Sequence, residues 1–242
     1  MTDENNISLS NSPNMDIISL AEKLDTQDLI GLTRSFVSDL RKGLDYVDSK
    51  RFPWIEEVAA RKWSGIVCLG MGGSAAGGDF LSVLSNLHGQ LPIHIQRDYV
   101  MPAWWNESWL VLTTSHSGNT EEALTATEIA INAGATVIVI STGGMLAGLP
   151  EIYTRCYLIP SIGGQPPRTA FGHIFSRQLG LLRCLGMLPK AEGTNDSEML
   201  ERLQNASDGF DILKDPQGDL IELAVYMASR PIALVGPTEL SA

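Results

Sequence analysis

The chain has 242 residues, 44% of them hydrophobic and 19% charged, which is typical of a folded protein with a sizeable core. Its formal net charge of −11 at pH 7 argues against nucleic acid as a partner, because sequence-independent binding needs Lys and Arg on the phosphates. A phosphorylated ligand would therefore have to be held by local groups and not by a global positive field.

The chain shows no targeting or membrane signal. No apolar run approaches the roughly 20 residues of a membrane helix, and residues 1–14 are polar and acidic, unlike a signal peptide. Cys68, Cys156 and Cys184 lie in apolar surroundings without metal-ligand spacing, which predicts buried, reduced thiols and no metal site. We expect a cytoplasmic protein without a membrane partner.

The N-terminal part is predicted to be a tail followed by helix. Residues 1–15 are too polar to order themselves and are expected to form a disordered tail. From residue 26, apolar residues at three-to-four spacing predict one amphipathic helix. These residues are Leu29, Leu32, Phe36, Leu40 and Leu44.

Short apolar runs alternate with helical segments from residue 65, a pattern that is typical of a parallel sheet covered on both faces. Strands are expected at 65–69, 93–96, 109–113, 136–140 and 156–159. Helices are expected at 75–88 and 120–133, with a shorter turn at 145–149. The prediction is a doubly wound α/β domain with a five-stranded, flavodoxin-like parallel sheet.

The C-terminal third is expected to link this domain to a second one. A proline-containing lead-in is followed by a long helix through residue 188, then by helices at 196–213 and 219–229. A buried strand at 232–236 ends in glycine, as the first strand does, and so indicates the start of a second α/β unit. We divide the chain into 1–15, 16–190 and an incomplete part at 191–242, and interpret it as a fragment.

The first chemical motif, Gly-Met-Gly-Gly-Ser-Ala-Ala-Gly-Gly, occupies residues 70–78 and joins the first strand to a helix. Its glycines allow a ligand to approach the backbone, and the helix N-terminus offers free N–H groups to an anion. The pattern also fits a dinucleotide fingerprint, for which Asp98 would bind the ribose.

The second motif, Thr-Ser-His-Ser-Gly-Asn-Thr, occupies residues 114–120 after the third strand. The hydroxyls of Ser115, Ser117 and Thr120 are expected to converge on a helix N-terminus, which forms a phosphate site without Lys or Arg. The structural alternative is a capping box of Asn119 and Glu122. Glu121 and Glu122 are expected to face solvent.

These two motifs, with Pro-Pro-Arg-Thr-Ala at 166–170, resemble those of the sugar isomerase (SIS) domains of bifunctional phosphoglucose/phosphomannose isomerases. The resemblance covers the chain from about residue 20. It implies that Gly73 and Ser74, together with the hydroxyls of the second motif, bind the substrate and its phosphate. It also implies a homodimer that acts without a metal or cofactor.

The implied reaction interconverts glucose 6-phosphate or mannose 6-phosphate with fructose 6-phosphate through an enediol. The matching arginine is Arg168, which would stabilise the negative oxygen of that intermediate. The family's glutamate base, a histidine from the partner subunit and a lysine would fall beyond Ala242, so the chain is expected to be inactive alone. His116 is expected to tune its loop, and His173 to pack between helices.

Two other functions are compatible with parts of the pattern. A non-catalytic SIS module that senses a phosphosugar would lack Arg168 or a second domain, and would usually carry a DNA-binding segment. A nucleotide-dependent enzyme would use the glycine loop alone, and titration with NAD would distinguish it.

Overall fold

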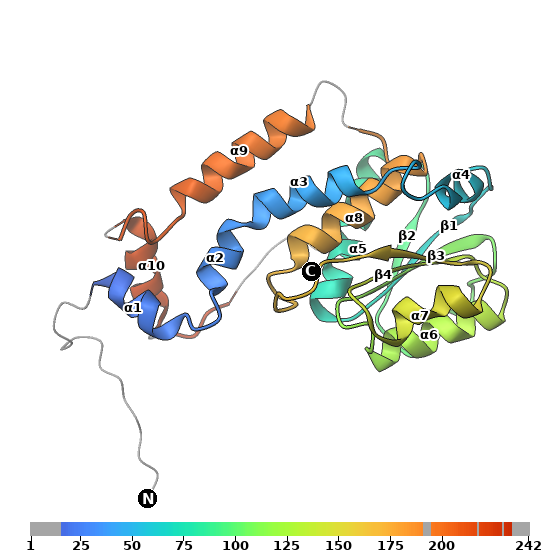
Figure 1. The fold of residues 1–242 in the computed structure, drawn as a ribbon, viewed down its shortest axis with the longest axis horizontal. Coiled ribbons are helices and arrows are strands. Elements are labelled where there is room, and N and C mark those ends of the chain that lie inside the picture. The colour runs from blue at the N-terminus through green and yellow to red at the C-terminus, as the bar shows by residue number, and fades with distance from the viewer. Residues whose placement is uncertain (1–15, 191–194, 217, 229, 234–242) are drawn as a thin grey trace, which may run out of the picture.

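A computed structural model describes residues 16–190, 195–216, 218–228 and 230–233. Five parallel strands form one sheet in the order β2-β1-β3-β4-β5 (Figure 1). This is the predicted flavodoxin-like α/β arrangement. The strands are β1 (Gly65–Leu69), β2 (Ile93–Gln96), β3 (Trp109–Ser115), β4 (Val137–Ser141) and β5 (Cys156–Pro160).

Helices cover both faces of the sheet. Side chains of α6 and α7 are buried against one face, and those of α5 and α8 against the other, where α3 lies along α8 (Figure 1). These helices are α3 (Phe36–Tyr46), α5 (Gly72–His88), α6 (Glu121–Asn132), α7 (Gly144–Ile152) and α8 (Phe171–Cys184). The remaining ones are α1 (Ile17–Leu24), α2 (Leu29–Arg34), α4 (Trp54–Ala59), α9 (Asp196–Gly209) and α10 (Asp219–Ala228).

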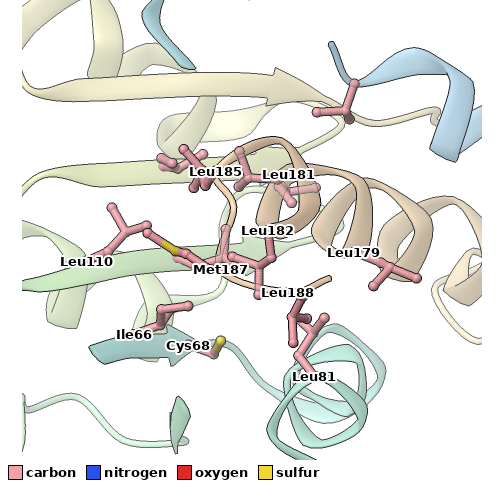
Figure 2. Close-up of a cluster of buried hydrophobic side chains, with 14 of the residues drawn as sticks. Ile66, Cys68, Leu81, Leu110, Leu179, Leu181, Leu182, Leu185, Met187 and Leu188 are labelled. Atoms are coloured by element: carbon pink, nitrogen blue, oxygen red, sulfur yellow. The ribbon is translucent and has the colours of Figure 1, made fainter. Parts of the chain in front are cut away.

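The two cores follow from alternation along the strands. In β1, Ile66 and Cys68 join the core beneath α8, whereas Val67 and Leu69 join the core beneath α6 and α7. Figure 2 shows the first of these cores, in which Leu181 and Leu182 of α8 point toward the strands. The central strands β1 and β4 are buried along their whole length and are almost entirely apolar, as the sequence pattern indicated, whereas the edge strands β2 and β5 are only partly buried.

The predicted helix over residues 26–44 is broken into α2 and α3 at Ser35. The Ser35 hydroxyl oxygen lies 2.9 Å from the Leu32 carbonyl oxygen and 2.8 Å from Asp39 Oδ2, so its single proton is shared between these two acceptors. A serine bonded back to its own turn competes with the helical ladder. This local competition explains the break, which hydrophobic spacing alone did not reveal.

Close packing of α3 on α8 explains two glycines. A Cβ atom at Gly172 would lie 2.9 Å from the Phe36 carbonyl oxygen, and one at Gly43 would overlap the Ser176 hydroxyl. Gly43 and Gly172 therefore allow the two helices to approach each other closely.

Several sequence predictions differ from the structure or lie outside it. Cys184 is exposed, although its thiol donates to the Val47 carbonyl oxygen at 3.3 Å, whereas Cys68 and Cys156 are buried as predicted. The helix that was predicted to run through residue 188 ends at Cys184. The predicted tail at 1–15 and residues 234–236 of the last predicted strand lie outside the described residues.

Candidate functional site

The two predicted motifs meet where the strand order reverses, at the carboxyl ends of β1 and β3. A Cβ atom at Gly70 would lie 2.9 Å from the Thr114 carbonyl oxygen, so only glycine fits there. The backbone N–H of His116 donates to the Ser74 hydroxyl at 3.2 Å. A crevice at this reversal point is the usual ligand site of doubly wound sheets.

Hydroxyl groups gather in the loop after β3. The hydroxyls of Ser115 and Thr120 are bonded to each other at 2.9 Å, and the Gly118 N–H donates to Ser115 at 3.0 Å. The Ser117 hydroxyl is exposed and accepts only a 3.3 Å bond from the Asn119 N–H. These oxygens lie at the first turn of α6, whose N–H groups have no acceptor within the helix and favour an anion.

The structure contradicts the capping-box alternative for the same residues. The N-cap of α6 is Thr120, which makes no side-chain cap. The Asn119 side chain instead accepts a 2.9 Å bond from the Met145 N–H in the first turn of α7. Asn119 therefore connects two helix starts and leaves the first turn of α6 open.

Glu121 and Glu122 begin α6 and were expected to face solvent. Glu121 is exposed, and Glu122 is half-buried. The negative charge of Glu122, and more weakly that of Glu121, raises the pKa of the exposed Tyr99 side chain. Glu122 thus lies near Tyr99 and is not directed only to solvent.

A third loop, which the sequence analysis did not single out, supports the site. The Thr142 hydroxyl donates to the His116 carbonyl oxygen at 2.6 Å, and the Thr142 N–H donates to the same atom at 3.2 Å. Thr142 follows β4 in the segment Ser-Thr-Gly-Gly. The hydroxyl and glycine residues that directly follow β4 could have identified this loop from the sequence as part of the site.

His116 lies within the site without a charge at neutral pH. Burial lowers the pKa of its imidazole below the ordinary value of 6.5. Its Nε2 atom is buried and has no hydrogen-bond partner among the described residues. His116 therefore supplies no positive charge to an anion at pH 7.

Arg168 is exposed in the turn that precedes α8. The neighbouring Pro167 carbonyl oxygen lies 3.7 Å from the position that a Cβ atom of Gly73 would occupy. The fold therefore brings the Arg168 segment beside the glycine loop, although the two are 95 residues apart in the sequence, as their residue numbers show. Among the described residues, no carboxylate lies within ion-pair distance of Arg168.

His173 is buried between α8 and α3, as predicted for a helix-packing histidine, with its Nε2 atom 3.2 Å from Asp39 Oδ1. Burial lowers the pKa of His173 below 6.5. The charge of Asp39 raises that pKa and so opposes burial, whereas the charges of Arg177 and Lys42 lower it further. The imidazole is consequently neutral at pH 7 and donates its single proton to the carboxylate.

Acidification is expected to destabilise the protein through this histidine. Below pH 6.5 the unfolded chain binds a proton that the folded His173 does not, so the free energy of unfolding falls as the pH drops. We predict that His173→Gln, which keeps a donor toward Asp39, reduces the loss between pH 7 and about pH 5. Urea unfolding of the parent protein and of His173→Gln at both pH values tests this. An equal loss of unfolding free energy in the two proteins would contradict it.

Within the described residues, no helix is long and apolar enough to cross a membrane. In the same part of the chain, no three His, Cys, Asp or Glu side chains are grouped so that they could hold a metal ion.

Comparison with known proteins finds sequence similarity to sugar-phosphate isomerases. No protein-family model matches the chain. It is 41% identical over 128 residues to a bifunctional phosphoglucose/phosphomannose isomerase of Caldicellulosiruptor bescii, covering 51% of this chain and 36% of the relative. It is 31% identical over 180 residues to the Aquifex aeolicus protein of that name, covering 73% of this chain and 52% of the relative.

The chain is a homologue of these isomerases. It spans about half or less of the length of the curated phosphoglucose/phosphomannose isomerases that it matches. The SIS fold agrees with solved structures. Tagatose-6-phosphate ketose/aldose isomerase from Escherichia coli superposes with a TM-score of 0.56 at 15% identity, over 78% of this chain and 54% of that one. A candidate phosphosugar isomerase from Silicibacter pomeroyi superposes with a TM-score of 0.61 at 17% identity, over 84% of this chain and 61% of that one.

Proposed function

We propose that this chain provides the phosphosugar-binding SIS domain of an aldose-ketose isomerase that interconverts glucose 6-phosphate, mannose 6-phosphate and fructose 6-phosphate. The observation that carries the proposal is the junction between the Ser74 loop and the Ser115–Thr120 loop at the switch point of the sheet. Hydroxyl and N–H groups in that crevice suit a phosphate dianion. The names of the homologues supply the substrate class.

The proposed roles follow from this arrangement. Ser115, Ser117 and Thr120 hold the phosphate together with the first turn of α6, and Gly73 with Ser74 borders the sugar. Arg168 comes from the segment beside Gly73 and faces the reacting carbons. In the open-chain aldose a base removes the proton from C2 and negative charge develops on O1. The hydroxyl proton of O2 then passes to O1, and the base returns its proton to C1 as O2 becomes the carbonyl. A fixed guanidinium stabilises that oxygen in the transition state.

Use of both epimers has a simple chemical basis in this proposal. Glucose 6-phosphate and mannose 6-phosphate differ only in the configuration at C2, and that configuration is lost when C2 becomes planar in the enediol. One site that binds the phosphate and the enediol oxygens therefore serves both sugars, provided that its base reaches C2 from either epimer.

We further propose that the proton-transfer base lies outside these 242 residues. The two carboxylates that directly follow the second loop, Glu121 and Glu122, begin α6 and lie near Tyr99, whose pKa their charges raise. In this proposal the cytoplasmic enzyme is a homodimer that needs neither a metal nor a cofactor. The 242-residue chain alone then binds fructose 6-phosphate but does not convert it, and turnover by this chain would contradict the assignment.

The protein expressed from its complete reading frame is expected to form fructose 6-phosphate from both glucose 6-phosphate and mannose 6-phosphate, and to do so with a chelator present. Coupled assays on the two substrates measure this directly. Binding of fructose 6-phosphate without turnover of either sugar would favour a phosphosugar-sensing module. Binding of NAD without phosphosugar would favour a nucleotide enzyme.

The Ser117 hydroxyl provides a mild test of phosphate binding. Ser117→Ala is expected to weaken fructose 6-phosphate binding about tenfold or more, the usual cost of a hydrogen bond to a charged group. Thermal unfolding should not change, because the hydroxyl is exposed and accepts one long bond. Calorimetric titration measures the affinity.

Ser108→Ala is the matched control, since Ser108 precedes the same strand at its other end. Equal affinities of the Ser117 and Ser108 variants would place the phosphate elsewhere.

A further inference from the structure

Asp39 is a buried carboxylate on α3 that joins three parts of the fold. It is 2% exposed. Its Oδ2 atom accepts bonds from the Ser35 hydroxyl at 2.8 Å and from Gln165 Nε2 at 3.2 Å. Its Oδ1 atom accepts from His173 Nε2 at 3.2 Å. Burying a carboxylate is costly even when it is bonded, so stability alone gives little reason for an acid at this position.

The two donors that are remote in sequence direct their N–H groups to this carboxylate. Gln165 Oε1 and His173 Nδ1 are both buried without a hydrogen-bond partner among the described residues. Leaving a buried polar atom unsatisfied costs about 1–3 kcal/mol. Each side chain thus directs its donor to Asp39 while its other polar atom stays unpaired.

These donors lie on either side of Arg168. Gln165 precedes it by three residues and His173 follows it by five, so one carboxylate holds both ends of the segment. Between them, Pro166 and Pro167 have fixed φ angles. The Pro166 carbonyl oxygen also accepts a 3.0 Å bond from the Thr169 N–H. The segment is therefore stiff, and its anchorage sets the position of Arg168.

The same segment borders the glycine loop, because the Pro167 carbonyl oxygen lies against Gly73. The helices that carry the anchorage, α3 and α8, run side by side (Figure 1). Loss of the Asp39 bonds would therefore change the distance between Arg168 and the crevice. A displacement of about 1 Å at a catalytic group can cost about 10²-fold in rate.

We propose that Asp39 is a positioning residue that holds the Arg168 segment against the glycine loop through Gln165 and His173. It touches neither substrate nor reacting atoms and acts only through this segment. The catalytic consequence rests on the proposed isomerase function, but the structural effect on the segment does not.

The test first removes and then reverses the hydrogen bond between Gln165 and Asp39. Gln165→Glu keeps the side-chain shape but replaces the amide donor by a carboxylate, which repels Asp39 unless it takes up a proton, and so weakens the anchorage of the segment at alkaline pH. In the double variant Asp39→Asn with Gln165→Glu, the new amide donates to the new carboxylate and can still accept from His173. Restoration by the second change separates positioning from general damage.

Two readouts are taken on the complete protein. Trypsin cleavage after Arg168, followed by mass spectrometry under native conditions, should become about tenfold faster in Gln165→Glu and return to within about twofold of the parent in the double variant. The kcat on glucose 6-phosphate should fall about tenfold or more and be restored in the same way, with a smaller change in KM.

Unchanged cleavage in Gln165→Glu, or no restoration in the double variant, would overturn the role of Asp39. Absence of turnover in the parent protein would instead refute the proposed isomerase, and the cleavage rates would still decide whether Asp39 holds the segment.

Discussion

Arg168→Ala is expected to lower kcat/KM for both glucose 6-phosphate and mannose 6-phosphate by about 10²–10³-fold, the usual effect of removing a group that stabilises a developing oxyanion. Thermal unfolding should be unaffected, because Arg168 is exposed and makes no ion pair among the described residues. Arg168→Lys keeps the charge but loses the planar fork and should recover only part of the rate.

Arg61→Ala is the control for this prediction. Arg61 precedes β1 at the opposite edge of the sheet, where it donates to the Thr136 hydroxyl and stacks on Trp63. Its loss should affect stability and leave catalysis intact. A similar loss of kcat/KM in both variants would remove the special role of Arg168, and full activity of Arg168→Ala would contradict the enediol assignment.

Gly118→Ala is expected to have the largest effect on the fold of the site. Gly118 has φ +71°, and an added Cβ would overlap the Gly143 carbonyl oxygen and reach 2.7 Å from the Ser141 hydroxyl. Backbone strain and this clash together should cost about 2–4 kcal/mol of unfolding free energy. Fructose 6-phosphate binding should also be lost, since the hydroxyl loop can no longer close on the segment after β4.

Gly186→Ala separates strain from the clash. Gly186 has φ +70°, but nothing lies within 4 Å of its Cβ position. Only the strain of about 1 kcal/mol is then expected, with binding retained. Denaturant unfolding and titration of both variants provide the comparison, and equal effects would show that the contact between the two loops is unimportant.

The sheet and the loop positions were predictable because they depend on local sequence. Apolar strands followed by glycine or hydroxyl residues placed both motifs at one edge of the sheet, and the strand order then brought Ser74 to His116. The parallel topology accounts for this success, since consecutive strands put all their following loops on the same side.

The Asp39 network was not predictable in the same way. Its partner Gln165 lies 126 residues away from Asp39. In a helical pattern, a carboxylate next to an apolar stripe is expected to lie on the surface. The break at Ser35 was not predictable for a related reason. The hydrophobic spacing continues through Ser35, but contacts of its hydroxyl with Leu32 and Asp39 interrupt the helix there. Asn119 fitted a capping pattern, yet tertiary contact directs its side chain to α7.

The loops at residues 70–74 and 115–120 are proposed to bind the phosphate of a sugar phosphate. Titration of the isotope-labelled chain with fructose 6-phosphate, with fructose as the control, tests it most directly through the backbone amide resonances. We predict that the phosphosugar shifts the amide signals of Ser74, Ser117 and the first turn of α6, and that fructose shifts none of them. Shifts confined to other parts of the fold, or equal shifts with fructose, would contradict the account.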